Sequence, residues 1–156
     1  MSLNIVFMGT PEFSVPTLHA LIKNKFNVFK VYTQPPKKSK RDQKVNPTPI
    51  EEFCKKNKIS FSNPPNLNSE EELKIFKKLS PDIVIVVSYG QIIPKSFLDV
   101  VKFGFINIHA SLLPKWRGAA PIQRAIMNGD KKIGVSIMKI KEKLDSGPVL
   151  VSKELE

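Results

Sequence analysis

The stretch Ile83-Val84-Ile85-Val86-Val87 decides the fold class, because five consecutive β-branched residues form a strand without a polar face. A strand that is apolar on both faces is typical of the centre of a parallel sheet, where helices cover each side. Pro81 and Asp82 separate this strand from a preceding helical segment. We therefore expect an α/β protein built around residues 83–87.

Strands and helices alternate on both sides of this central segment. Further strands are predicted at 4–8, 27–33, 103–109, 133–139 and 149–154, and helices with Pro16 near the start, from Pro49, after Ser69 and over 121–128. Ser69 with Glu72 forms a capping box, and Thr48 before Pro49 is typical of a helix start. The alternation predicts a single domain with a Rossmann-like, doubly wound, mostly parallel sheet.

The composition excludes several classes of protein. No apolar run in the 156 residues approaches the ~20 residues that span a bilayer, so we expect no membrane segment. The first eight residues lack the basic region and cleavage site of a signal peptide, which favours a cytoplasmic location. Gly9 is the only glycine in the first turn, so a nicotinamide or flavin cofactor is not expected. One cysteine, Cys54, and two histidines allow no disulfide and match no metal-site spacing.

The net charge of +11 is high, but only three of the 25 basic residues are arginines. Such a charge fits an anionic partner such as nucleic acid, although a lysine-rich composition also arises from coding bias. A basic loop, residues 34–48, carries a single acid and the basic residues Lys37, Lys38, Lys40, Arg41 and Lys44. On composition alone such a run is usually a solvated loop.

Two polar residues end the predicted strand 103–109. Side chains alternate along a strand, so Asn107 and His109 share one face, at the carboxyl end where open α/β sheets bind ligands. The strand pattern alone fits two interpretations equally. The pair is either a site that projects into a crevice, or a satisfied core histidine beside a turn residue.

The segment 111–124, Ser-Leu-Leu-Pro-Lys-Trp-Arg-Gly-Ala-Ala-Pro-Ile-Gln-Arg, resembles the signature of the methionyl-tRNA formyltransferases. Residues 7–16, 33–35 and 88–94 are similar to that family at corresponding points, so the resemblance runs nearly from end to end. It implies the formyltransferase fold and transfer of a formyl group from 10-formyltetrahydrofolate to the methionine of initiator tRNA, for translation initiation. Tetrahydrofolate and initiator methionyl-tRNA are then the partners, without a metal, and a monomer is the expected state.

The resemblance also implies a catalytic trio of Asn107, His109 and Asp145. The chemistry supports it, because attack of an amine on a formyl carbonyl needs donors for the developing oxyanion and a group that takes a proton. Asn107 and a protonated His109 would donate, and Asp145 would pair with the imidazolium and help to move the proton. Without the resemblance, Asp145 in Leu144-Asp145-Ser146-Gly147 would be a plain turn residue.

Binding residues are implied in the same way. Folate is expected to lie against Ser88, Tyr89, Gly90, Gln91 and Ile92 and against Ser111, Leu112, Leu113 and Pro114. Tyr89 and Ile92 are candidate walls, with core packing as the alternative, and Ser111 is expected to serve a turn rather than act as a nucleophile. The five basic residues of the loop 34–48 would contact phosphates of the tRNA acceptor arm.

Family members continue beyond the length of this chain. Residues 1–156 are therefore expected to be a formyltransferase catalytic domain that is incomplete at its C-terminal end, without the separate C-terminal domain, either as a fragment or as a reduced form. Two other functions remain open. One is a formyltransferase for a small amine, such as an amino sugar or a purine precursor, and the other is a catalytically weak module that binds folate or tRNA.

Overall fold

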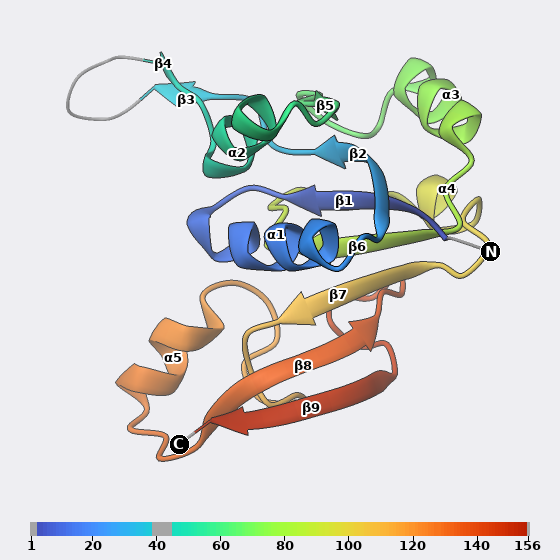
Figure 1. The fold of residues 1–156 in the computed structure, drawn as a ribbon. Helices are drawn as coiled ribbons and strands as arrows, with labels where there is room; N and C mark the ends of the chain where they lie inside the picture. Colours follow the sequence, from blue (N-terminus) through green and yellow to red (C-terminus); the bar gives the residue numbers. More distant parts are fainter. Residues whose placement is uncertain (1–2, 39–44, 156) are drawn as a thin grey trace.

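A computed structural model describes residues 3–38 and 45–155, and Figure 1 shows one large sheet with helices beside it. The strands are β1 (Asn4–Gly9), β2 (Asn27–Tyr32), β3 (Lys37–Lys38), β4 (Val45–Asn46), β5 (Phe61–Ser62), β6 (Ile83–Val87), β7 (Phe105–His109), β8 (Ile133–Lys139) and β9 (Val149–Leu155). The helices are η1 (Glu12–Ser14, a 3-10 turn), α1 (Val15–Lys23), α2 (Pro49–Asn57), α3 (Glu70–Leu79), α4 (Lys95–Leu98) and α5 (Pro121–Met127).

The large sheet has the order β5-β2-β1-β6-β7-β8-β9, so the apolar strand β6 lies at its centre, as the sequence predicted. All pairs from β5 to β7 are parallel. The last two strands are antiparallel, since β8 runs against β7 and β9 against β8. The expected Rossmann-like, mostly parallel sheet is confirmed, with an antiparallel edge that the alternation of helices and strands did not specify.

Two apolar clusters cover the two faces of the sheet. On one face, α3 and α4 bring Phe76 and Phe97 against buried side chains of β1, β6 and β7. On the other face, α1 and α2 bring Leu18 and Ile50 against Phe7 of β1 and neighbouring strands. This burial on both sides explains why β6 contains no polar residue.

The predicted helix starts are observed, with one difference at α3. The Thr48 hydroxyl accepts the N–H of Glu51 at 3.1 Å, and the Ser69 hydroxyl accepts the N–H of Glu72 at 3.1 Å. The Glu72 carboxylate does not complete the capping box, because it accepts the Tyr32 hydroxyl at 3.0 Å. Burial, together with this carboxylate, raises the pKa of Tyr32 above its usual value.

Several local features differ from the sequence prediction. The strand predicted at 103–109 begins only at Phe105, because Gly104 adopts a φ of +79° and turns the chain. The two-residue strand β5 and the one-turn helix α4 are too short for a periodic pattern. The arms of the basic loop pair as the small antiparallel ribbon β3-β4, with Lys37 opposite Asn46. Within the described ranges, no helix combines the length and apolar character needed to cross a bilayer.

Cys54 is expected to resist alkylation in the folded chain. It is fully buried on α2, and burial, with a smaller contribution from Glu51, raises the pKa of its thiol to about 11. At pH 8 only about one thiol in a thousand is then ionised, and the thiolate is the reactive form. Labelling at pH 8 should be complete in denaturant and should be negligible over the same period without it. Equal rates in the two conditions would contradict this placement.

Candidate active site

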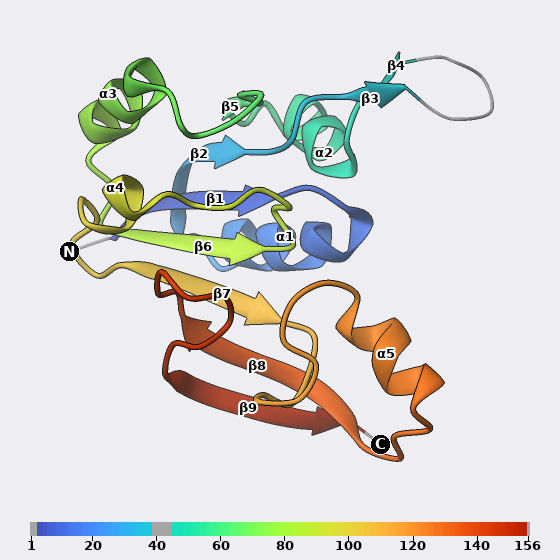
Figure 2. The ribbon, with the colours of Figure 1, turned by 180° about the vertical axis from the view of Figure 1, so that it is seen from behind.

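The strands β1, β2, β6 and β7 end at one edge of the sheet, and Figure 2 shows α5 and the ribbon β3-β4 at this same edge. Buried hydroxyls tie the strand ends together. Thr10 Oγ1 donates to the carbonyl of Tyr89 at 2.7 Å and accepts the N–H of Gln34 at 3.2 Å. Ser14 Oγ donates to the carbonyl of Val87 at 2.6 Å. Hydrogen bonds therefore connect the strand ends at the edge where the sequence predicted a ligand site.

His109 and Asp145 meet at this edge although 36 positions separate them in the sequence. The distance from His109 Nδ1 to Asp145 Oδ2 is 3.7 Å, and the two side chains are only 8% and 11% exposed. Asp145 lies in the turn between β8 and β9, and its Oδ2 accepts the backbone N–H of Gly118 at 2.7 Å. Asp145 is therefore both a turn residue and a neighbour of the histidine.

The other ring nitrogen of His109 also faces an acceptor. His109 Nε2 lies 2.9 Å from the backbone carbonyl oxygen of Trp116. A carbonyl oxygen only accepts, so this hydrogen bond requires a hydrogen on Nε2. A doubly protonated ring would find an acceptor at Trp116 and a carboxylate at Asp145. This environment differs from that of a histidine packed among apolar side chains.

Asn107 lies two residues before His109 on the same face of β7. The ladder places Asn107 opposite Met138 and His109 opposite Ser136 on β8. Asn107 is half-buried, and its neighbour Ile108 packs on the opposite face against the cluster of α1 and α2. The alternation predicted for this strand is confirmed. The structure therefore brings the three residues of the expected trio to one region.

The loop after β7 is held by short polar contacts. The Ser111 hydroxyl is buried and donates to the carbonyl of Lys115 at 2.6 Å, so Ser111 serves a turn, as expected. Ser136 Oγ donates to the Ser111 carbonyl at 2.8 Å and accepts the N–H of Leu113 at 3.1 Å. These bonds fasten the first half of the loop to β8.

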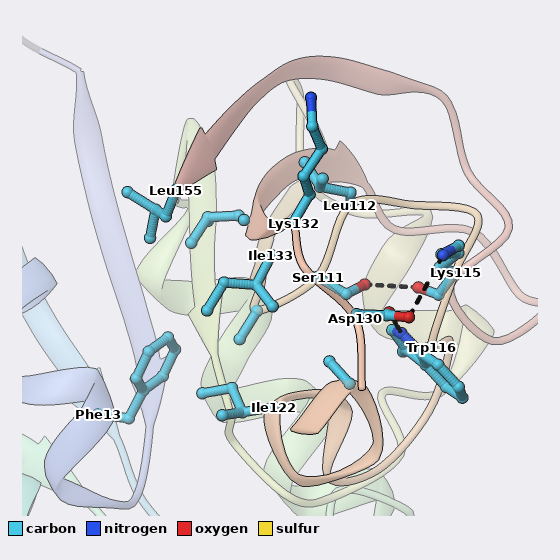
Figure 3. Close-up of a pocket in the computed structure, with 14 residues that line it drawn as sticks. Phe13, Ser111, Leu112, Lys115, Trp116, Ile122, Asp130, Lys132, Ile133 and Leu155 are labelled. Atoms are coloured by element: carbon cyan, nitrogen blue, oxygen red, sulfur yellow. Dashed lines mark hydrogen bonds and ion pairs between the residues drawn. The ribbon is translucent and has the colours of Figure 1, made fainter. Parts of the chain in front are cut away.

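A cavity of about 110 Å³ lies beside this loop, a feature that the sequence did not predict. Figure 3 shows Phe13, Ile122 and Ile133 on its apolar side, with Trp116 and Asp130 together on another side. Ser111 and Leu112 line the cavity. The residues that surround it come from η1, the loop after β7, α5, the start of β8 and the end of β9, and neither His109 nor Asp145 lines the cavity.

The 88–94 loop follows the central strand and turns sharply outward. Ser88 and Gly90 have φ values of 47° and 81°, which give the loop two left-handed positions. Tyr89 packs its ring in the core, whereas Ile92 is 89% exposed. Of the two expected walls, only the Ile92 side chain faces outward. Gln91 Nε2 donates to the carbonyl of Pro64 at 3.0 Å, which anchors the loop.

The basic loop is described only at its two arms. Lys37 and Lys38 form β3, and Figure 1 shows the ribbon projecting away from the large sheet. Lys40, Arg41 and Lys44 lie outside the described residues. The ribbon β3-β4 therefore lies at the same edge of the sheet as α5 and the loop after β7.

Residues 3–156 match the family model described as Formyl transferase. The chain belongs to the formyl transferase family. The family resemblance drawn from residues 111–124 is confirmed, and Asn107, His109 and Asp145 lie within the matched region of a formyl transferase.

Individual relatives of this formyl transferase chain are named methionyl-tRNA formyltransferase. It is 58% identical over 150 residues to the methionyl-tRNA formyltransferase of Pelagibacter ubique (strain HTCC1062), covering 96% of this chain and 48% of that protein. The methionyl-tRNA formyltransferase of Coxiella burnetii (strain RSA 331 / Henzerling II) is 50% identical, with the same coverage. The chain thus spans about half the length of the curated relatives it matches. A phosphoribosylglycinamide formyltransferase from Bacillus halodurans shares the fold, with a TM-score of 0.78, 21% identity, and coverage of 97% of this chain and 79% of that one.

Sequence reasoning missed the backbone groups of this candidate site. The Trp116 carbonyl and the Gly118 N–H contact the predicted histidine and aspartate, and backbone groups leave no signature in residue type. Asp130 was also missed, because Asn128-Gly129 before it signals a turn but not that this turn meets Trp116, 14 positions earlier in the chain. Among residues 3–38 and 45–155, no cluster of three or more His, Cys, Asp or Glu side chains suits a metal ion.

Proposed function

We propose that this chain carries the transfer of a formyl group from 10-formyltetrahydrofolate to the amino group of methionine on initiator tRNA, in the cytoplasm. The observation that carries the proposal is the position of His109, 2.9 Å from the Trp116 carbonyl and 3.7 Å from Asp145, beside Asn107. Relatives named methionyl-tRNA formyltransferase support this choice of acceptor.

The proposed chemistry assigns one task to each polar side chain. Attack of the amine on the formyl carbon moves negative charge onto the formyl oxygen, which hydrogen-bond donors stabilise. The Asn107 amide supplies one such donor on the face that it shares with His109. The nitrogen Nδ1 of His109, on the side away from the Trp116 carbonyl, is the ring position that can carry a second exchangeable proton into the site.

Asp145 completes this arrangement as the charge partner. Its Oδ2 is held by the Gly118 N–H at 2.7 Å, so the carboxylate is fixed before the substrate binds. At 3.7 Å from Nδ1 it compensates the charge of a protonated ring, and it is close enough to receive the proton that the attacking amine releases. Collapse of the tetrahedral adduct then breaks the bond between the formyl carbon and the folate nitrogen, which takes the proton carried by His109 Nδ1 and leaves as tetrahydrofolate, so no covalent bond to the protein is required.

For the formyl donor, we propose the surface between the 88–94 loop and the start of the loop after β7. Ile92 offers an exposed apolar side chain for a flat ring. Gln91 Oε1 is buried without a hydrogen-bond partner among the described residues, and the N–H groups of a pteridine ring would supply one. Ser88, Tyr89 and Gly90 would contribute backbone groups, and Ser111, Leu112, Leu113 and Pro114 the opposite side.

The test is a formylation assay on the purified chain with 10-formyltetrahydrofolate and methionyl-charged initiator tRNA. Formation of formyl-methionyl-tRNA supports the proposal, provided that uncharged tRNA gives no product. Parallel reactions offer an amino sugar and a phosphoribosylated amine as acceptors. Transfer to either small amine with none to tRNA would overturn the acceptor, and donor binding without any transfer would overturn the activity.

The ribbon β3-β4 provides a separate prediction for tRNA binding. Replacing Lys37 and Lys38 by glutamine should weaken binding and reduce the slope of log K against log salt by about 1.5, because each phosphate contact releases counterions. Lys40, Arg41 and Lys44 belong to the same proposed contact. The matched control replaces Lys77 and Lys78, two adjacent exposed lysines in the last turn of α3. Equal slopes in both double variants would show that the ribbon is not a contact.

A further inference from the structure

Trp116 holds a backbone conformation that ordinary residues avoid. Its φ is +57°, in the left-handed region, which residues with a Cβ disfavour. Its carbonyl oxygen is the atom that faces His109 Nε2 at 2.9 Å. Something must fix this peptide against relaxation, since a return to negative φ would turn the carbonyl away from the ring.

Asp130 supplies that restraint through the indole. Trp116 Nε1 donates to Asp130 Oδ2 at 2.7 Å, which is short for such a bond and typical of a charged acceptor. Figure 3 shows the two side chains meeting at the side of the cavity. The indole is thus tied to the turn that follows α5, at a point 14 positions further along the chain.

Asp130 is itself held firmly. Asn128 Nδ2 donates to its other oxygen, Oδ1, at 2.8 Å, and Lys115 Nζ lies 3.5 Å from the same atom. Its backbone N–H donates to the carbonyl of Ala125 at 3.0 Å, and its side chain is only 8% exposed. Hydrogen bonds from Asn128 and Trp116, followed by the nearby Lys115, hold the pKa of Asp130 below its usual range. The acceptor therefore stays ionised at neutral pH.

We infer that Asp130 is a positioning residue, which locks Trp116 so that its carbonyl keeps the hydrogen on Nε2 of His109. Asp130 bonds the Trp116 indole and not the His109 ring, so it acts on the histidine through Trp116. The second ring nitrogen then remains directed at Asp145. The effect on turnover rests on the proposed function, whereas the effect on the ring does not.

The composition of the chain makes this inference directly measurable. Trp116 is the only tryptophan, so fluorescence reports its environment alone, and His109 and His19 are the only histidines. In Asp130→Ala, we expect a shift of the tryptophan emission and a change in the ¹⁵N signals of the His109 ring toward the other tautomer, with the His19 signals unchanged. Turnover should fall 10- to 100-fold with an unchanged KM for the formyl donor.

Three further variants separate positioning from a general loss of structure. Asp130→Asn keeps an oxygen for the indole and should restore most of the His109 signals. Trp116→Phe removes the same hydrogen bond, and the double variant with Asp130→Ala should be no worse than either single one. Asp99→Ala, at an exposed aspartate paired with Lys95 away from this edge, should leave all signals unchanged.

The positioning role of Asp130 can be tested even if one variant fails to fold or the wild-type chain shows no transfer, because the His109 ring signals are the readout. Trp116→Phe carries the ring test when Asp130→Ala is unfolded. His109 signals that match the wild type in both variants would overturn the positioning role. Absent turnover in the wild type would contradict the proposed function alone, because the tautomer signals are measured without substrate.

Discussion

Replacing His109 by alanine is expected to lower the proposed formyl transfer to methionyl-tRNA by about 10³-fold or more, with the fold retained. Nε2 is held by the Trp116 carbonyl, and Nδ1 lies beside Asp145 as the position of the exchangeable proton, so removal of the side chain abolishes the proton carrier of the proposed site. Single-turnover measurement with saturating donor and charged tRNA isolates the chemical step from product release. The substitution also leaves the Trp116 carbonyl and the Asp145 carboxylate without their histidine partner. Asp145 keeps the hydrogen bond from the Gly118 N–H, so the surrounding loop should stay in place.

The matched control is His19→Ala, at the other histidine of the chain. His19 is exposed on α1 and lies edge-on to Phe53 on the neighbouring helix. Its replacement should change turnover less than about twofold, because exposed side chains outside a site rarely affect catalysis or stability. Similar rates for His109→Ala and the wild type would remove His109 from the mechanism and leave the trio without its centre.

Phe76→Ala is expected to lower the free energy of unfolding by about 3–5 kcal/mol, a large share of the stability of a single domain. Phe76 is fully buried on α3 and contacts three aromatic rings. Its centroid lies 4.7 Å from that of Phe97, 6.1 Å from that of Phe105 and 6.1 Å from that of Tyr32. Truncation leaves a cavity between a helix and the sheet that these rings cannot fill. Urea unfolding at constant pH measures the loss.

Ile75→Ala provides the comparison on the same helix. Ile75 precedes Phe76 but points outward, with 44% of its surface exposed, so its loss should cost less than about 1 kcal/mol. Equal losses for the two variants would mean that α3 docks on a different face. The two variants therefore test, independently of any activity, whether Phe76 packs in the apolar cluster between α3, α4 and the sheet.

The fold was largely predictable because its signals are local. Five β-branched residues indicated the central strand, and Thr48-Pro49 and Ser69 gave the starts of α2 and α3. The direction of β8 and β9 was not predictable, since an apolar pattern defines the face of a strand but not the direction of its neighbour. The ribbon β3-β4 was missed for a related reason, because two-residue pairings leave no periodicity.

The side chains proposed for the candidate site could be named from the sequence, whereas the backbone groups that surround them could not. Asn107 and His109 stood out as polar residues at a strand end, and Asp145 came from the family resemblance alone. The contacts that orient them depend on left-handed positions at Trp116 and Gly118, which only the folded loop defines. Asp130 joins the region through an indole hydrogen bond between distant positions, a contact that no sequence spacing encodes.

The strand order also determines how the protein emerges during its synthesis. β1 is made first, yet one of its two neighbours is β6, which pairs Ile5 with Ile83. A nascent chain therefore carries β1 with an open apolar edge until residues up to Val87 have left the ribosome, a period in which chaperones would protect it. Asp145 follows much later, after β7 and β8. The strands up to β7 can therefore pair before the turn that carries Asp145, between β8 and β9, has been synthesised.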